Sequence, residues 1–278
     1  MIIYTALITP FKEDDTLDEL GFIELINEQK NANIDALIIL GTTAETLTLS
    51  CEEKTRLIEL AIEHKGNLLI SVGCGSSSTK QTLINIQQAA TLGADSALVA
   101  SPAYTKPTDA GLIQHFMSIA DTSPIPIILY NHPPRTGVNL TCEMQCQLAT
   151  HPNIIGVKEA SGDLVQITDI LMKRPKDYFV LAGDDLQIIP FLALGAEGIA
   201  SVATNLIAPT IRKLVDTRSI SLQKEIWPLL RLIFSESNPI GIKGALTLAQ
   251  KPAGTPRLPL VPMSQQLESH LKPIIDKL

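Results

Sequence analysis

The chain has 278 residues, of which 45% are hydrophobic and 18% are charged, so it can bury a sizeable core and is not typical of a disordered protein. Its net charge of −7, without a basic stripe, argues against a nucleic-acid-binding protein. No apolar run approaches the ~20 residues of a membrane-spanning helix, and the N-terminus lacks the charged start and cleavage site of a signal peptide. We therefore expect a soluble, cytoplasmic protein that does not bind membranes.

Short apolar runs alternate with longer amphipathic segments along the chain. The runs are rich in Ile, Val, Leu and Ala and lack strict alternation, which is typical of parallel strands buried on both faces. Strands are therefore predicted at residues 3–8, 36–40, 68–73, 96–100, 125–131, 154–159, 179–183 and 198–201.

The segments between these runs carry signals for the start of a helix. Capping-box patterns begin at Ser50 and Ser78, where a Glu or Gln follows three residues later. Further starts are predicted at Thr108, Thr141, Asp163, Asp184 and Asn205. After residue 217 the strand signals stop, and residues 222–234, 241–250 and 262–277 are predicted to be helical.

Strands that alternate with helices form either a closed barrel or an open doubly wound sheet. The even spacing of the strand–helix units, and the absence of a GxGxxG motif after the first strand, favour the barrel. We predict a (β/α)8 TIM barrel over residues 1–217 and a C-terminal helical region over residues 218–278.

Active sites of such barrels lie at the C-terminal ends of the strands, where one lysine is the most informative residue. Strand alternation places Ile154, Gly156 and Lys158 on one face, and if this face points inward the Lys158 amine lies at the barrel mouth, above a glycine that leaves room beside it. A partly desolvated lysine has a lowered pKa and can form a Schiff base with a ketone. The alternative is a strand-end lysine paired with Glu159 or an aspartate.

Hydroxyl and guanidinium groups follow other predicted strands. Tyr130 could shuttle protons at a Schiff base together with Thr43 and a second phenol, Tyr104, although strand-end tyrosines can also simply close the core. The Gly-Thr-Thr turn with Thr42 could present backbone N–H groups to a carboxylate, or be an ordinary turn. Arg135, in a Pro-rich loop, is placed to hold a second carboxylate, or is a solvated arginine.

A metal site is not expected. The five histidines are scattered, and Asp184 and Asp185 have no His or Cys beside them. The four cysteines, Cys51, Cys74, Cys142 and Cys146, are interpreted as buried free thiols.

Six motifs occur together in one order along the chain: Gly41-Thr-Thr-Ala-Glu45, Ser101-Pro-Ala-Tyr104 with Lys106-Pro107, Leu129-Tyr-Asn-His-Pro-Pro-Arg-Thr-Gly137, Gly156-Val-Lys-Glu-Ala-Ser-Gly162, Gly183-Asp-Asp185 and Ser237-Asn-Pro-Ile240. In this combination the sequence resembles the dihydrodipicolinate synthase / N-acetylneuraminate lyase family of class I aldolases, and within it the synthase branch. The resemblance runs from the first strand to the C-terminal helices.

The resemblance implies condensation of pyruvate with L-aspartate-4-semialdehyde, without a metal or organic cofactor, because the protonated imine is itself the electron sink. Lys158 would form the imine. Tyr130 would relay protons, with Thr43 between it and Tyr104. In this family that last tyrosine comes from a neighbouring subunit, so a homodimer would be the smallest competent unit and a homotetramer, a dimer of dimers, the expected assembly.

The remaining positions implied by the resemblance bind the two substrates. Thr42 and Thr43 would hold the pyruvate carboxylate with the backbone around Gly183 and Ala200. Arg135 would bind the carboxylate of the semialdehyde, and this arginine favours the synthase over the alternative, a related aldolase acting on a sugar acid. A non-catalytic scaffold is a further alternative, although the lysine and phenols are all present.

The sequence departs from the family pattern at several positions. Ala44 stands where glycine is usual, which is tolerable if the turn needs no positive φ, Thr46 stands where serine is usual, and His132 replaces a small apolar residue. Four further positions, Cys51, Ser77, Gln81 and Ala103, lack the side chains found in lysine-inhibited synthases. We expect weak or absent feedback inhibition by L-lysine.

Overall fold

The computed structural model describes residues 1–278 and contains a closed barrel of eight strands in chain order. The strands are β1 (Ile2–Ala6), β2 (Ala36–Ile39), β3 (Leu69–Gly73), β4 (Ser96–Ala100), β5 (Ile127–Asn131), β6 (Ile154–Glu159), β7 (Phe179–Ala182) and β8 (Gly198–Ser201). The predicted TIM barrel is confirmed, and each predicted strand is present, with differences only at the ends.

The chain divides into two compact units. The central unit consists of Met1–Ile2 and Leu69–Ala200, and the terminal unit consists of Ile3–Leu68 and Ser201–Leu278. The predicted boundary at residue 217, between a barrel and a helical extension, is a different kind of division and stays a prediction.

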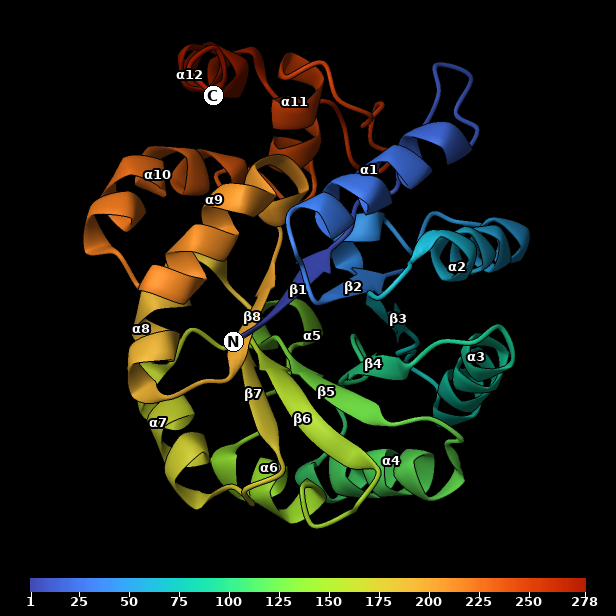
Figure 1. Cartoon of the computed structure of the whole chain (residues 1–278). Helices are drawn as coiled ribbons and strands as arrows, with labels where there is room; N and C mark the ends of the chain where they lie inside the picture. Colours follow the sequence, from blue (N-terminus) through green and yellow to red (C-terminus); the bar gives the residue numbers. More distant parts are fainter. The chain divides into compact units, whose positions relative to one another are not determined.

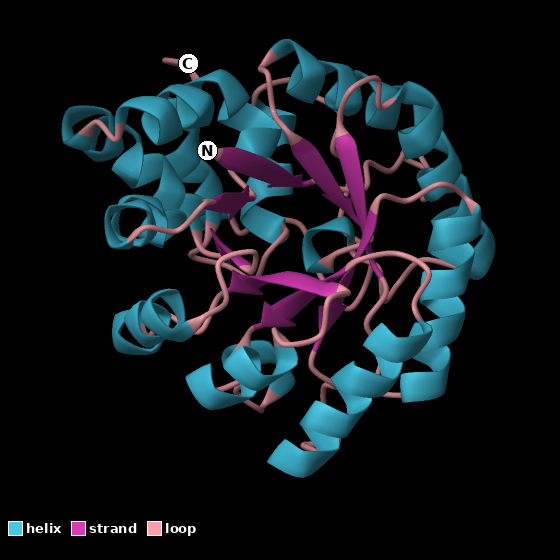
Figure 2. Ribbon diagram, turned by 60° about the horizontal axis from the view of Figure 1, so that its bottom comes forward, coloured by secondary structure: helices cyan, strands magenta, loops and turns pink.

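The central unit contains β3 to β8, which pair in parallel with their neighbours. Apart from the four-residue helical turn that follows β5, its helices lie outside the strands (Figure 1). The colouring by secondary structure in Figure 2 shows the same arrangement. These helices are α3 (Thr79–Thr91), α4 (Asp109–Thr122), α5 (Pro133–Thr136), α6 (Cys142–Leu148), α7 (Leu164–Lys173) and α8 (Ile188–Leu194), with a 3₁₀ turn η2 (Asp185–Gln187).

The register of β5 against β6 determines which side chains face the barrel interior. Tyr130 is paired with Lys158, and Asn131 with Glu159. Residues paired in register project to the same face of a sheet. Glu159 accepts a hydrogen bond from Gln145 of α6 at 2.8 Å, so its face is the one covered by helices. Lys158 and Tyr130 therefore point inward.

The terminal unit pairs β1 with β2 and contains the helices from both ends of the chain. They are α1 (Glu19–Asn31), a 3₁₀ turn η1 (Thr42–Ala44), α2 (Cys51–His64), α9 (Thr204–Thr217), α10 (Ile220–Ile233), α11 (Ile240–Leu248) and α12 (Gln265–Ile275). The three helices predicted after residue 217 are confirmed. Among the helices of both units, none combines the length and the apolar character that a membrane span requires.

Side chains cap most helices where the sequence predicts it. At Ser50 both hydrogen bonds of the capping box are present. Side-chain caps without the reciprocal bond of a capping box are made by Ser78, Thr108, Thr141, Asp163 and, at η2, Asp184. The cysteines are free as predicted, but only Cys74 and Cys142 are buried.

A helix begins within one residue of Asn205, as predicted, but the Asn205 side chain does not cap it. Helix α9 begins at Thr204, with Ala203 in the capping position. The buried Asn205 side chain instead accepts a hydrogen bond from Ile8 N at 3.1 Å and donates one to Ala6 O at 2.8 Å. These backbone groups lie at and just beyond the end of β1, where the strand ladder no longer satisfies them.

Candidate active site

Lys158 occupies the penultimate position of β6 and is only 7% exposed. Its Nζ lies 4.6 Å from the centroid of the Tyr130 ring on the neighbouring strand. Burial lowers the pKa of Lys158 from 10.5 to about 8, because the charged ammonium loses its hydration. At pH 7 about a tenth of such a lysine is the nucleophilic free amine, compared with about 0.03% of an unshifted one. The room that Gly156 leaves is filled by Phe179, whose ring a Cβ would meet at 2.5 Å.

Two acidic residues after β7 have different roles. The Asp184 side chain accepts a hydrogen bond from Leu186 N at 2.9 Å and caps η2. Asp185 is buried, and its negative charge opposes the lowering of the Lys158 pKa. In the sequence this pair was considered as a metal candidate and Asp184 was named as a helix start, but Asp185 was assigned no role in the site. The position of Asp185 just after a predicted strand end was the signal that could have found it. No group of three or more His, Cys, Asp or Glu side chains is placed to hold a metal ion.

His132 follows β5 and packs edge-on against Tyr130, with ring centroids 5.8 Å apart and an interplanar angle of 84°. Burial, together with the positive charges of Arg135 and Lys158, lowers the pKa of His132 from 6.5 to about 4. The imidazole is therefore neutral at physiological pH. The histidine that replaces a small apolar residue adds bulk beside Tyr130 and no charge.

Arg135 lies in α5, a single helical turn where the sequence predicted a loop. Pro133 and Pro134 occupy the first two positions of this turn, and Gly137 ends it in the left-handed conformation at φ 76°. The Arg135 side chain is exposed. Its charge lowers the pKa of Lys158, so the guanidinium lies within electrostatic reach of the amine.

Tyr104 follows β4 in an exposed segment. Its side chain is 96% exposed, and its backbone is left-handed at φ 70°. A phenol in this position makes little contact with its own chain. The expected role of Tyr104 in a neighbouring subunit stays a prediction.

The Gly-Thr-Thr turn after β2 belongs to the terminal unit and forms η1. Positive φ values occur at Leu40 (55°) and Glu45 (54°), and not at Ala44, so alanine in the usual glycine position causes no strain, as expected. Asn238 Nδ2 donates a hydrogen bond to Thr43 Oγ1 at 2.9 Å. The sequence assigned no role to Asn238, although it lies in the Ser-Asn-Pro-Ile motif.

Gly183 and Ala200, at the ends of β7 and β8, are the last two of the predicted substrate-binding residues. Gly183 N donates to Glu159 O at 2.7 Å. A Cβ at Gly183 would lie 2.8 Å from both Ala160 Cβ and Glu159 O, so a larger residue does not fit. Ala200 is buried near the end of β8.

The structure brings part of the predicted site together. Within the central unit, Lys158, Tyr130 and His132 lie side by side, with Asp185 and Arg135 in electrostatic reach. Thr42 and Thr43 belong to the terminal unit. Their approach to Lys158 stays a prediction.

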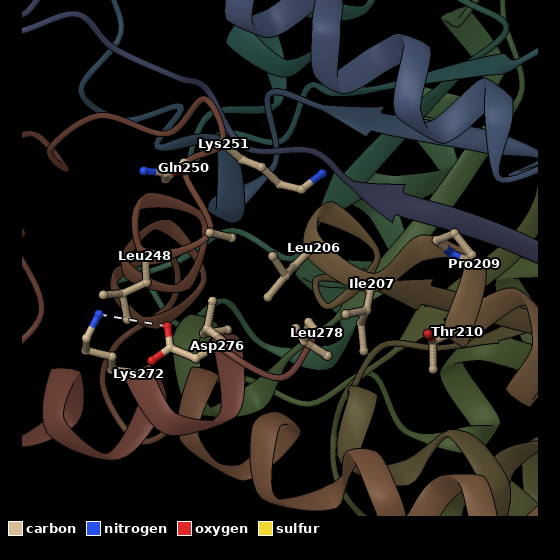
Figure 3. A pocket seen from close by; sticks show the side chains of 12 residues that line it. Leu206, Ile207, Pro209, Thr210, Leu248, Gln250, Lys251, Lys272, Asp276 and Leu278 are labelled. Atoms are coloured by element: carbon tan, nitrogen blue, oxygen red, sulfur yellow. Dashed lines mark ion pairs between the residues drawn. The ribbon is translucent and has the colours of Figure 1, made fainter.

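A cavity of about 640 Å³ in the terminal unit contains none of the predicted site residues. It is lined by side chains of α9, the end of α11 and α12, among them the ion pair of Lys272 Nζ with Asp276 Oδ1 at 3.8 Å (Figure 3). Its lining lacks the buried lysine and phenol that a Schiff-base site needs, so it is not the candidate active site.

Known proteins of one family match this chain over nearly its full length. The model of the Dihydrodipicolinate synthetase family matches residues 1–278. Two relatives named 4-hydroxy-tetrahydrodipicolinate synthase are 40% identical (Protochlamydia amoebophila; 99% of this chain, 96% of the relative) and 41% identical (Exiguobacterium sibiricum; 96% and 94%).

Solved structures give the same result. Dihydrodipicolinate synthase from Thermotoga maritima has a TM-score of 0.96 at 33% identity, covering 99% of this chain and 97% of the other. The enzyme from Cyanidioschyzon merolae, solved with lysine bound, has a TM-score of 0.96 at 34% identity, covering 100% and 98%. The chain therefore belongs to the dihydrodipicolinate synthetase family.

Proposed function

We propose that this protein condenses pyruvate with L-aspartate-4-semialdehyde to 4-hydroxy-tetrahydrodipicolinate, the first step of the diaminopimelate branch of lysine biosynthesis. The relatives are named for this activity. The observation that carries the proposal is the buried Lys158 amine, whose pKa is lowered to about 8 and which lies against Tyr130. A Schiff-base aldolase needs a buried amine with a lowered pKa, and here the amine faces the barrel interior at the C-terminal end of β6.

The chemistry begins when the Lys158 amine attacks the ketone carbon of pyruvate and water leaves. The protonated imine draws electrons from the methyl carbon, which loses a proton and becomes an enamine. The enamine carbon attacks the aldehyde and forms the new carbon–carbon bond. The amino group of the semialdehyde then attacks the imine carbon, which closes the ring and releases the lysine. No metal or organic cofactor takes part in these steps.

Proton transfer at the imine is assigned to Tyr130, with Thr43 and Tyr104 as further members of the relay. The ring of Tyr130 packs against Lys158 Nζ at 4.6 Å, which supports its place in the relay. Tyr104 is 96% exposed, which suits a phenol that acts in a neighbouring subunit.

Substrate binding is assigned to groups that present hydrogen-bond donors. Thr42 and Thr43 hold the pyruvate carboxylate, together with the backbone near Gly183 and Ala200. Arg135 holds the carboxylate of the semialdehyde; its exposed side chain and its electrostatic reach to Lys158 support this assignment.

We further propose that the protein is cytoplasmic and works as a homotetramer, or at least as a homodimer. Helix α7 supports an assembly because apolar side chains on its outer face remain exposed. Among them Val165 and Met172 are each 73% exposed. Apolar groups that share an exposed helix face are typical of a surface covered by a partner.

We propose that L-lysine inhibits this enzyme weakly or not at all. Ser77 Oγ donates to Ala103 O at 2.8 Å, and Gln81 Nε2 donates to Asn85 Oδ1 at 2.9 Å, so each of these two side chains already has a partner within the chain. Cys51 is a free, exposed thiol, which is only a weak hydrogen-bond donor and acceptor. None of these groups is an acid that could hold a lysine ammonium group.

A related aldolase that acts on a sugar acid is the alternative function, because it would share Lys158 and Tyr130. The two functions differ in the aldehyde they accept. A coupled assay with pyruvate should give product with L-aspartate-4-semialdehyde and little with N-acetylmannosamine or a sugar aldehyde. The variant R135A should raise the KM for the semialdehyde by about tenfold or more, and by a larger factor than the KM for pyruvate. Turnover only with sugar aldehydes would overturn the proposal.

A further inference from the structure

Glu45 ends the η1 turn in an unusual state, because it is fully buried and has a left-handed backbone at φ 54°. A residue other than glycine holds this conformation only where its surroundings stabilise it. The backbone N–H of Glu45 donates to Thr42 O at 3.0 Å, so the residue is also part of the turn. A displacement of Glu45 therefore displaces the Thr42–Thr43 segment.

Two groups from the C-terminal part of the chain hold the Glu45 carboxylate. Lys243 of α11 donates from Nζ to Oε1 at 2.7 Å, and Arg257 donates its backbone N–H to Oε2 at 2.7 Å. Lys243 is buried like its partner, and its Nζ also lies 4.2 Å from the centroid of the Phe11 ring. Both carboxylate oxygens thus have a fixed donor.

Stability alone does not account for this pair. Removing a lysine and a glutamate from water costs several kcal/mol each, and apolar residues of similar size often stabilise a fold as well or better. Burial lowers the pKa of Lys243, and the Glu45 carboxylate offsets part of this effect. A buried ion pair instead fixes a geometry, because a single arrangement satisfies both charges.

The other residues of the turn are held in the same way. Asn238, just before α11, donates to Thr43 Oγ1 at 2.9 Å. Because that oxygen accepts this hydrogen bond, the hydroxyl proton of Thr43 is free to point elsewhere. Thr9 Oγ1 donates to Ala44 O at 2.9 Å. Three consecutive residues of one short turn are therefore each fixed by a side chain distant in sequence.

We propose that Glu45 and Lys243 are positioning residues, which set the Thr42–Thr43 turn in the geometry that binds the carboxylate of the keto acid. The inference rests on the proposed function of this turn. It gives α11 a role in substrate selection: the helix anchors the turn and does not touch the substrate. If the Glu45–Lys243 ion pair contributes only to folding, its removal should not change the preference of the enzyme for a ketone that carries a carboxylate.

The test compares two ketones that differ in the charge that the turn would bind. Pyruvate carries a carboxylate, whereas methyl pyruvate is an uncharged ester of the same keto acid. The rate of borohydride trapping on Lys158 is measured with each ketone at concentrations well below saturation. The ratio of the two rates reports carboxylate recognition, and it does not depend on the fraction of protein that is folded.

The variant K243M should lower the pyruvate to methyl pyruvate ratio by about tenfold or more, because a misplaced binding group loses much of its effect. The double variant E45L/K243M replaces the ion pair by apolar side chains, which is expected to preserve folding. It should lower the ratio to a similar degree. The matched control is K251M, which removes another lysine of the same unit, paired with Glu28 of α1. It should keep the wild-type ratio within about twofold.

The possible outcomes separate this inference from the proposed function. If wild-type protein traps neither ketone on Lys158, the proposed function fails. If wild-type protein traps both, but K243M and the double variant keep its ratio, the positioning role is refuted. A fall in the ratio in both variants, with K251M unchanged, supports it. Should K243M yield too little folded protein, the ratio measured on the double variant decides alone.

Discussion

The reactivity of the Lys158 amine should rise with pH through a midpoint near 8, because burial lowers the pKa of this lysine from 10.5 to about 8. The sign follows from the nucleophile: the neutral amine attacks, so the rate of imine formation increases as the ammonium loses its proton and levels off above the pKa. An unshifted lysine would still be gaining reactivity at pH 10. Between pH 6 and pH 8 the amine fraction should increase from about 1% to about 50%.

The assay is borohydride trapping with pyruvate in large excess, with the adduct quantified by mass spectrometry at each pH. Two variants move the midpoint in opposite directions. D185N removes a negative charge that raises the Lys158 pKa, so its midpoint should fall, and R135A removes a positive charge that lowers the pKa, so its midpoint should rise. A wild-type profile that climbs without a plateau up to pH 10, or midpoints that move in the reverse order, would refute the electrostatic account of Lys158.

Three further predictions concern stability, packing and regulation. K158M should raise the free energy of unfolding at pH 7 by roughly 3 kcal/mol, because it removes a buried group whose protonation is disfavoured in the folded state. Chemical denaturation measures the change, and an equal or lower stability would contradict it. The sign is that of a lysine with a depressed pKa, so the gain should be largest below pH 8 and vanish above pH 10.5. G183A should destabilise the protein by about 1–3 kcal/mol, since its Cβ would lie 2.8 Å from Ala160 Cβ and Glu159 O, and thermal unfolding measures the loss. Millimolar L-lysine should leave the rate nearly unchanged, whereas strong, saturable inhibition would contradict the expected loss of lysine feedback.

Local patterns in the sequence were sufficient to predict the barrel. The apolar runs at β5 and β6 show which side chains share a face, because side chains alternate between the two faces along a strand. Tyr130 and Lys158 each lie next to the last residue of their strand, and the structure pairs them in register. The inward direction of Lys158 follows from this alternation and from the requirement that one face be covered by helices. Its desolvation is a consequence of the same geometry.

Contacts between distant residues were beyond the reach of such patterns. Lys243 and Glu45 are 198 positions apart, and Asn238 and Thr43 are 195 apart, so no periodicity relates them. Asn205 is a second case in which a contact between distant residues decided the role of a side chain. Its residue type suggested a helix cap, but the tertiary fold uses its amide to satisfy backbone groups next to β1.

The most direct measurement is the location of the covalent adduct after borohydride reduction in the presence of pyruvate. Peptide mapping should find one reduced pyruvyl group on Lys158, and none on Lys243, which is also buried but engaged by Glu45. The adduct should disappear in K158M. A wild-type protein without an adduct, or with one on another lysine, would contradict the Schiff-base account of this enzyme.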